Sequence, residues 1–349
     1  MIKSMSISKD NKILITGGAG FIGSNLSNYL LAKGWEVTIV DNLSRNGTWE
    51  NLVWLKNNHR YSKLNVNIID IRNFNEIKRI ISKVNVIYHL AGQVAVTTSF
   101  LNPRHDFEVN ALGTFNILEA ARELGHRPII IFASTNKVYG QMNGVNVKEG
   151  KFRYSYRNFP DGIDEEHHLD FHSPYGCSNG VADQYTRDYY RMYNIPTVVF
   201  RQSCIYGPRQ MGIEDQGWVA HFAISTVLGK RINIYGDGKQ VRDLLHVYDL
   251  IEAYQNAVKN IKKSAGQVYN IGGGVEHSFS LLEYLKYLEE LSGKKIKTKF
   301  DEWRPGDQKV YITNIKKLKN ELSWRPKISH KKGLKELFEW VKKNKELFK

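Results

Sequence analysis

Three glycines and one acidic residue near the amino terminus have the spacing of a site for a phosphate-bearing ligand. Gly17, Gly20 and Gly23 lie between an apolar strand expected at 12–15 and a helix. The first glycine permits a tight turn, the second lets the backbone approach a pyrophosphate, and the third lets the helix pack against the strand. Asp41 follows at the end of the next expected strand, where its carboxylate can accept hydrogen bonds from both hydroxyls of a ribose. These residues predict a dinucleotide site, and the carboxylate favours NAD over NADP because it would repel a 2′-phosphate.

Residues at the ends of the following strands are expected to line the same cofactor. Asp70 is placed to meet the adenine, although capping of a helix that starts near Asn73 is an alternative role for it. Arg45 lies close to Asp41 in the chain, and because of this arginine NADP remains an alternative cofactor. The other expected cofactor contacts here are Phe21, Ile22, Asn42, Ser44, Ile71, Leu90, Ala91, Gln93 and Asn110.

The elements that must position these residues are strands that alternate with helices. The apolar patterns predict further strands at 37–40, 66–69, 84–90, 129–132 and 197–200, and helices at 22–33, 104–124 and 174–193. Such alternation requires crossover connections and a parallel sheet with helices on both faces. We therefore expect an α/β protein with a Rossmann-type, doubly wound parallel sheet, whose ligands lie beyond the carboxyl ends of the strands.

After Gly207 the alternation becomes irregular, which predicts a smaller C-terminal substrate-binding domain. Residues 10–206 would form the NAD-binding domain, and residues 241–275 would return to its sheet. Residues 207–240 and 276–349 would form a cap over the substrate.

Composition and charge limit the class of protein. The chain has 349 residues, 42% of them hydrophobic, and no apolar run of about 18 residues that could span a membrane. The net charge of +15 favours an anionic partner, and because few aromatic residues are interleaved with the scattered lysines we expect a substrate diphosphate, not nucleic acid. Cys177 and Cys204 are too few for a disulfide framework and indicate a reducing cytoplasm. His167 and His168 point apart on a regular backbone, so no metal site is expected.

The chain resembles the extended short-chain dehydrogenase/reductase family over nearly its whole length. The matching pieces are residues 17–23, Asp41, Asp70, 109–114, 135–140 and 173–175. The resemblance implies that Thr135 and Tyr175 both contact the reacting hydroxyl of a sugar. It also implies that Tyr175 accepts the proton of this hydroxyl while a hydride leaves the carbon for the nicotinamide.

One catalytic position departs from the family pattern, because Asn179 stands where the family has a lysine four residues after the tyrosine. A free tyrosine has a pKa of about 10 and needs nearby positive charge to act as a base near neutral pH. The family's lysine supplies this charge and holds the nicotinamide ribose, whereas asparagine is shorter and uncharged. We therefore expect slow or impaired catalysis. Lys137 is another cation near the motif, although a solvent-facing position in a loop is expected for it.

The residues after the catalytic threonine narrow the reaction that the resemblance implies. Dehydratases of the family have an Asp-Glu pair there, but this chain has Asn136 and Lys137, which disfavours dehydration. Residues 134–140, 169–178 and 215–219 are similar to the CDP-paratose 2-epimerase (CDP-tyvelose 2-epimerase) group. This similarity implies oxidation and re-reduction at C2 of a CDP-linked dideoxyhexose. A UDP-sugar 4-epimerase and a catalytically silent protein that binds NAD and a nucleotide sugar remain alternatives.

Residues of the expected cap resemble the family's contacts to substrate. The guanidinium groups of Arg242 and Arg304 can each bind two phosphate oxygens, with surface ion pairs as the alternative. Trp218 either meets the nucleotide or belongs to the core. The other expected substrate contacts are Thr135, Asn136, Arg209, Gln210, Gln216, Gln240 and Asp307. The resemblance also implies that helices near 104–124 and 175–193 pair across a two-fold axis, so a homodimer or homotetramer is expected.

Overall fold

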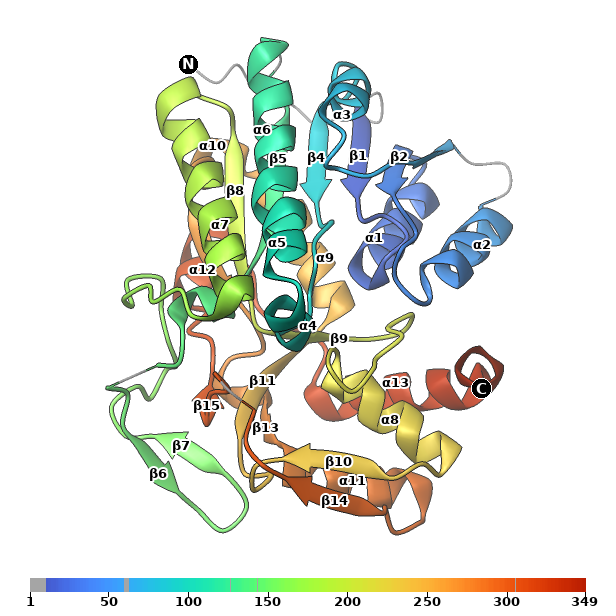
Figure 1. Ribbon diagram of the computed structural model, residues 1–349, viewed down its shortest axis with the longest axis vertical. Coiled ribbons are helices and arrows are strands. Elements are labelled where there is room, and N and C mark those ends of the chain that lie inside the picture. Colours follow the sequence, from blue (N-terminus) through green and yellow to red (C-terminus); the bar gives the residue numbers. More distant parts are fainter. Residues whose placement is uncertain (1–10, 60–62, 126, 143, 305) are drawn as a thin grey trace.

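A seven-stranded sheet forms the centre of the larger lobe (Figure 1). The computed structural model describes residues 11–59, 63–125, 127–142, 144–304 and 306–349, so the expected domain start at residue 10 lies outside the described residues. The strand order is β12-β8-β5-β4-β1-β2-β3, and every neighbouring pair is parallel. The strands are β1 (Lys12–Thr16), β2 (Glu36–Asp41), β3 (Leu64–Ile68), β4 (Val86–His89), β5 (Ile129–Thr135), β8 (Thr197–Gln202) and β12 (Val268–Ile271).

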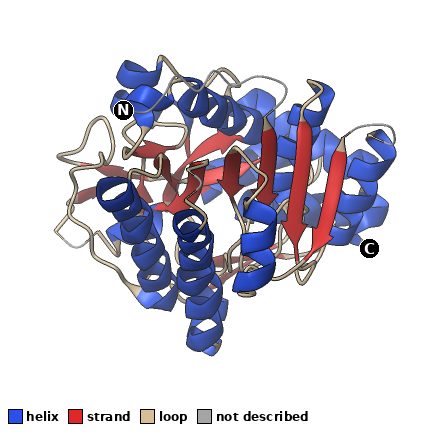
Figure 2. Ribbon diagram, turned by 90° about the horizontal axis from the view of Figure 1, so that it is seen from above, coloured by secondary structure: helices blue, strands red, loops and turns tan. Residues whose placement is uncertain are grey.

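Helices cover both faces of this sheet, as the view from above shows (Figure 2). One face packs against α1 (Phe21–Ala32) and α9 (Val247–Lys259), with α2 (Thr48–Asn58) beside α1. The other face packs against α3 (Phe74–Ile81), α6 (Gly113–Glu123) and α7 (Ser173–Tyr193). Because β4 is buried along its whole length, it has no polar face and consists of apolar and aromatic residues that end in one histidine. The expected Rossmann-type α/β fold is confirmed.

The strand order reverses between β1 and β4, since β2 and β3 extend to one side of β1 and the later strands to the other. In sheets of this kind a ligand crevice opens at such a reversal, beyond the carboxyl ends of the strands. The arrowheads of β1 and β4 point toward the smaller lobe in Figure 1, so this crevice lies between the two lobes.

The smaller lobe has its own sheets and hydrophobic core. Strand β11 (Val241–His246) pairs with β9 (Cys204–Tyr206), β13 (Ser278–Ser280) and β15 (Val310–Tyr311), and β10 (Ile232–Tyr235) pairs with β14 (Thr298–Asp301). The helices around them are α8 (Trp218–Leu228), α11 (Leu281–Ser292) and α13 (His330–Lys343). Within 241–275, the range that we expected to return to the large sheet, β12 does so, but β11 belongs to this second sheet.

Other elements differ from the pattern-based expectations. The helix expected over 104–124 is interrupted, because α5 (Pro103–Phe107) is followed by a π-helical turn at Glu108–Leu112 before α6 begins. Helices α2 and α4 (Val96–Leu101) were not predicted, nor was the hairpin of β6 (Val147–Glu149) and β7 (Tyr154–Tyr156). The remaining short helices are Asn136–Tyr139, α10 (Ile261–Ser264), Val275–His277, α12 (Lys316–Leu322) and Lys345–Phe348. Throughout the described ranges, each helix is too short or too polar to cross a membrane.

Candidate active site

The glycine turn between β1 and α1 has the close packing that its sequence predicts. Gly17 has a φ of 69°, and a Cβ at this position would lie 2.8 Å from the amide nitrogen of Ala91. A Cβ on Gly23 would lie 2.1 Å from the carbonyl oxygen of Gly17, so only glycine lets α1 approach the turn this closely. Gly20 precedes α1 and has no side chain to cap the first amide groups of Phe21 and the residues after it. These groups are thus available to the phosphates of a dinucleotide.

Asp41 joins the glycine turn to the loop that follows β2. Its Oδ2 accepts a hydrogen bond from the amide of Ala19 at 3.0 Å, and its Oδ1 accepts one from the amide of Leu43 at 2.9 Å. Burial raises the pKa of this carboxyl, and backbone hydrogen bonds from Leu43, Ala19 and Gly20 oppose the increase. The carboxylate therefore stands beside the turn, where it fits the ribose of NAD.

Asp70 belongs to a polar chain along the same edge of the sheet. Its oxygens accept hydrogen bonds from Arg72 at 3.0 and 2.9 Å and from Nδ2 of Asn42 at 3.0 Å, and the bonds from Arg72 lower its pKa to about 2. Asn42 in turn accepts from Ser44 at 2.7 Å. The cap of α3 is Asn73, whose side chain accepts from the amide of its third helical residue, so the alternative role of Asp70 as a cap is wrong.

The expected cofactor contacts of the next loop are held by a buried network. The amide of Gln93 donates to Oδ1 of Asn110 at 2.7 Å, and Nδ2 of Asn110 lies 3.1 Å from Oγ of Ser178. Oγ of Ser178 donates to the carboxylate of Asp106 at 2.5 Å, and the amide of Ala91 donates to Oγ1 of Thr16. Asn110 thereby positions the loop after β4 against α7 with both ends of its side chain. Leu90 is partly buried at the start of this loop, and Ile71 is buried beyond β3.

Thr135 and Tyr175 come together at the carboxyl end of β5. Thr135 is the last residue of β5, and Tyr175 lies in the first turn of α7. Burial raises the pKa of Tyr175, while a hydrogen bond with the hydroxyl of Thr135 and the positive charge of Arg45 lower it and the charge of Asp106 raises it. The phenol of Tyr175 and the hydroxyl of Thr135 thus lie together at the carboxyl edge of the sheet, the arrangement that the family resemblance implies.

Asn179 does not reach the hydroxyl of the tyrosine. Its Nδ2 donates a hydrogen bond of 2.9 Å to the backbone carbonyl of Tyr175, and the residue is 8% exposed. Nζ of Lys137 lies 3.7 Å from Oδ1 of Asp307, so the expectation that this lysine faces solvent is wrong. The cation that interacts electrostatically with Tyr175 is Arg45, which was predicted only as a cofactor contact.

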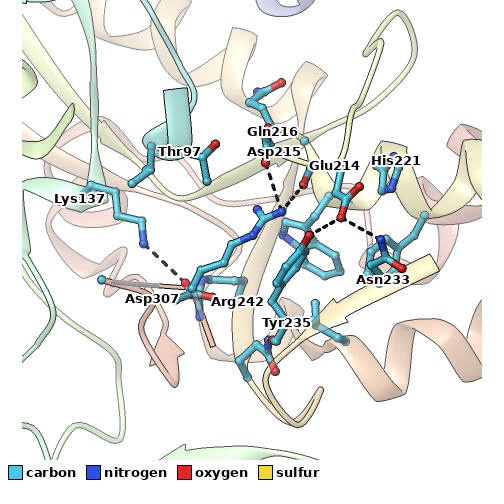
Figure 3. Close-up of a pocket in the computed structure, with 18 of the residues that line it drawn as sticks. Thr97, Lys137, Glu214, Asp215, Gln216, His221, Asn233, Tyr235, Arg242 and Asp307 are labelled. Carbon is cyan, nitrogen blue, oxygen red and sulfur yellow. Dashed lines mark hydrogen bonds and ion pairs between the residues drawn. The ribbon is translucent and has the colours of Figure 1, made fainter. Parts of the chain in front are cut away.

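A pocket opens between the two lobes and contains most of the expected substrate contacts (Figure 3). Arg242 donates to Oδ1 of Asp307 at 2.6 Å, and Arg304 pairs with Asp215 at 3.3 Å. The guanidinium of Arg45 reaches across from the larger lobe to Oε1 of Gln216 at 2.5 Å. The expected contacts that line this pocket are Gln216, Trp218, Gln240, Arg242, Arg304 and Asp307. Trp218 also has edge-to-face contacts with Phe222 and Tyr284, so it lines the pocket and packs against the core at the same time.

Four expected substrate residues do not line this pocket. The guanidinium of Arg209 lies over the rings of Trp54 and Trp340, at 4.4 and 5.6 Å from their centres. This arginine therefore joins the two lobes by cation–π contacts instead of lining the substrate pocket, which differs from its expected role as a substrate contact. Gln210 is buried and donates to the carbonyl of Ile205 at 3.2 Å. Thr135 lies beside Tyr175. Asn136, the next residue in the chain, is buried and lies within hydrogen-bond distance of Thr135.

Several lining residues were missed by the sequence analysis, among them Thr97, Glu214, Asn233 and Tyr235. The signal for the last two was present in β10, because Ile232 and Ile234 alternate with Asn233 and Tyr235. The isoleucines are buried, so the other two side chains lie on the opposite face of the strand.

The chain has relatives along nearly all of its length. Residues 14–337 match the family described as GDP-mannose 4,6 dehydratase. A CDP-paratose 2-epimerase of Salmonella typhi is 45% identical over 337 residues, covering 95% of this chain and 99% of that protein. A UDP-glucuronate 4-epimerase of Thermodesulfobacterium geofontis is 30% identical over 339 residues, covering 96% and 98%.

Solved structures of similar proteins share the whole fold. A UDP-glucose 4-epimerase of Thermotoga maritima, solved with UDP-glucose, has a TM-score of 0.82 and 31% identity, covering 95% of this chain and 99% of that one. A UDP-glucuronic acid 4-epimerase of Bacillus cereus, solved with UDP-glucuronic acid and NAD, has the same TM-score and coverage at 28% identity. The chain therefore belongs to the GDP-mannose 4,6-dehydratase family, within the extended short-chain dehydrogenases/reductases.

Proposed function

We propose that this protein is an epimerase that converts CDP-paratose to CDP-tyvelose by oxidation and re-reduction at C2 of the sugar. The observation that carries the proposal is the pairing of Thr135 with Tyr175 at the carboxyl end of β5, next to a pocket that contains Arg242 and Arg304. The relative named CDP-paratose 2-epimerase supports the choice of substrate. The broader assignment, an isomerase with an NAD cofactor, follows from the family and from the NAD-bound neighbour.

NAD fits the residues of the crevice. The glycine turn and the amide groups at the start of α1 would hold its pyrophosphate, and Asp41 would accept from its adenosine ribose. When bound, NAD supplies a group that can take a hydride from a sugar carbon and return it. Return to the opposite face of the flattened carbonyl inverts the carbon, with no net oxidation.

The side chains would divide the remaining work. Tyr175 would accept the proton of the sugar hydroxyl and later return it, and Thr135 would hold that hydroxyl in place. Arg242 and Arg304 would exchange their carboxylate partners, Asp307 and Asp215, for the diphosphate. With the diphosphate held, the reacting carbon would stay beside the phenol.

A second candidate function, binding of NAD and a nucleotide sugar without turnover, is favoured by one observation. The amide of Asn179 is bonded to its own helix and brings no charge to Tyr175, whose pKa burial raises. A phenol that keeps its proton near neutral pH is a poor base.

Turnover of defined substrates tests both functions. The protein would be incubated with CDP-paratose, and CDP-tyvelose would be detected by NMR, with UDP-glucose in parallel and Tyr175→Phe as the inactive control. Deuterium at C2 that stays in the product while the sugar inverts would support the 2-epimerase. Inversion at C4 of UDP-glucose with no change of CDP-paratose would show a UDP-sugar 4-epimerase. Tight binding of NAD and of CDP-paratose without product would favour the silent protein.

We also propose a homodimer or homotetramer that associates through the helices on one face of the sheet. Helices α6 and α7 lie side by side in Figure 1, and their region exposes large apolar side chains. These are Phe107, Leu112, Tyr185, Met192 and Tyr193. Sedimentation equilibrium would test the proposal, and Met192→Lys is expected to weaken the association. A parent protein that is monomeric would contradict the proposed oligomer.

A further inference from the structure

The residues that line the pocket between the lobes follow one another in an order that matches the sugar, the diphosphate and the base of a nucleotide sugar. Lys137 lies at one side, Arg242 and Asp307 follow, and Glu214 and Asn233 lie at the opposite side (Figure 3). A sugar at the catalytic tyrosine, with its diphosphate on the arginines, therefore directs its base toward Glu214. This step rests on the proposed function, because it assumes a nucleotide sugar in the pocket.

The carboxylate of Glu214 is held by one of its two oxygens. Oε1 accepts hydrogen bonds from the hydroxyl of Tyr235 at 2.5 Å and from Nδ2 of Asn233 at 3.1 Å. Among the hydrogen bonds of the described residues, none reaches Oε2. The hydrogen bond from Tyr235 lowers the pKa of this carboxyl, so the group is ionised near neutral pH and can only accept. Oε2 is thus an acceptor that remains for a ligand.

The neighbouring amides add further acceptors. Because Nδ2 of Asn233 faces a carboxylate, the orientation of this amide is settled, and its Oδ1 is buried without a partner in the described part of the chain. Gln240 is 4% exposed, and its Nε2 donates to the carbonyl of Tyr235 at 2.6 Å. Its Oε1 is likewise buried without a partner among the described residues. Buried acceptors normally have a donor, so this wall of the pocket suits a ligand that donates.

Arg304 covers this end of the pocket. Its guanidinium lies 4.0 Å from the centre of the Tyr235 ring and donates to the backbone carbonyl of Glu214 at 3.2 Å. A diphosphate that drew Arg304 away would uncover both the acceptors and the aromatic face of Tyr235. A base could then stack on this ring with its edge toward Glu214.

We propose that Glu214 makes this pocket select cytosine over uracil. Cytosine carries an exocyclic amino group at C4, which can donate to Oε2, whereas uracil has a carbonyl oxygen there, which the carboxylate would repel. Adenine and guanine also carry amino groups, and we assign the site to cytidine diphosphate because the substrate of the proposed function is linked to CDP. Glu214 is thus a residue that determines specificity, without a part in the proton transfer at Tyr175.

Binding of nucleoside diphosphates to the full-length protein tests this assignment without turnover. Isothermal titration would compare CDP with UDP, ADP, GDP and 2′-deoxy-CDP. CDP should bind at least about tenfold more tightly than UDP, because a site built for the C4 amino group of cytosine would face the C4 carbonyl oxygen of uracil instead. 2′-Deoxy-CDP should keep this advantage, since it rests on the base and not on the ribose.

Variants of two adjacent acidic residues sharpen the test. In Glu214→Gln, the donors of Tyr235 and Asn233 would hold the amide oxygen and turn the NH₂ group toward the ligand. The preference should then fall to about one or invert toward UDP. Asp215→Asn, which changes a neighbouring carboxylate paired with Arg304, should change the affinities of CDP and UDP by the same factor.

Equal affinity of the parent protein for CDP and UDP would overturn the inference, as would tighter binding of ADP or GDP than of CDP. So would a Glu214→Gln variant with an unchanged CDP-to-UDP ratio. These outcomes do not depend on catalysis. A protein that prefers CDP but produces no epimer would contradict the proposed function and leave the role of Glu214 intact.

Discussion

The side-chain amide of Asn179 donates a hydrogen bond of 2.9 Å to the backbone carbonyl of Tyr175, one turn earlier in α7. The donor of this side chain is therefore used inside the helix and does not reach the phenol. Burial dominates the pKa of Tyr175 and raises it, against the hydroxyl of Thr135 and the charge of Arg45. Thr135 and Tyr175 thus lie together, without the lysine that the family places one turn after the tyrosine.

Replacing Asn179 by lysine should restore that cation. The ammonium group would favour the phenolate and lower the pKa of Tyr175, so turnover near pH 7 should rise by roughly 10- to 1000-fold. The pH dependence of kcat, measured for the parent protein and for Asn179→Lys, checks this result. Asn179→Gln is the uncharged control and should leave the profile in place. An equal rate in the parent protein and the lysine variant would mean that another group already supplies the charge.

Arg45 is the group that could do so, because its charge acts on Tyr175 from the loop after β2. Removing this charge in Arg45→Gln should raise the pKa of Tyr175 further, whereas Arg45→Lys should largely preserve it. Ultraviolet difference titration, with Tyr175→Phe subtracted, reports the phenol directly. The change should be smaller when Asn179→Lys is also present. Identical titration curves for the parent protein and Arg45→Gln would rule out this role.

Two glycines of the turn should differ in what their replacement costs. A Cβ on Gly23 meets the carbonyl oxygen of Gly17 at 2.1 Å, so Gly23→Ala should lower the free energy of unfolding by about 1–3 kcal/mol and weaken NAD binding. At Gly20 the nearest atom is 3.2 Å away, so Gly20→Ala should affect NAD affinity more than stability. Urea unfolding and NAD titration measure the two quantities. Equal stability of both variants would contradict the packing argument.

The buried His89 should make the larger lobe sensitive to acid. Its ring lies between Oγ1 of Thr16 at 2.7 Å and Oγ1 of Thr114 at 2.9 Å, and burial lowers its pKa to about 4. Between about pH 6.5 and pH 4 the unfolded chain binds a proton that the folded chain does not. Stability should therefore fall as the pH falls through this window, by about 3 kcal/mol in total for this group.

Urea unfolding at pH 7 and pH 5 tests the role of His89. In His89→Gln, which keeps a polar group between the two threonines, the loss of stability at pH 5 should be smaller than in the parent protein. Some loss should remain, because burial also lowers the pKa of His246 to about 4. His168→Gln, at an exposed position, is the control and should behave like the parent protein. An undiminished loss in His89→Gln would assign the acid sensitivity to other groups.

The sequence by itself determined the features that depend on local backbone requirements and on strand ends. The turn at Gly17, the packing at Gly23 and the position of Asp41 follow from what a β-strand and a helix require where they meet around a phosphate. Thr135 was expected at the carboxyl edge of the sheet because it ends a strand, whereas its pairing with Tyr175, in the first turn of α7, was implied by the family resemblance. The boundaries of helices and strands were harder to predict. The π-helical turn before α6, for example, cannot be recognised from the apolar pattern.

Only the tertiary structure decided which partner each polar side chain takes. Arg209 stacks on Trp54 and Trp340, although its motif predicted a substrate contact. Lys137 turns to Asp307, 170 positions later in the chain, instead of to solvent. The physical reason is that an ion pair or a cation–π contact depends on which groups the two lobes bring within a few ångströms. The apolar pattern of a sequence does not indicate contacts between residues that lie so far apart in the chain.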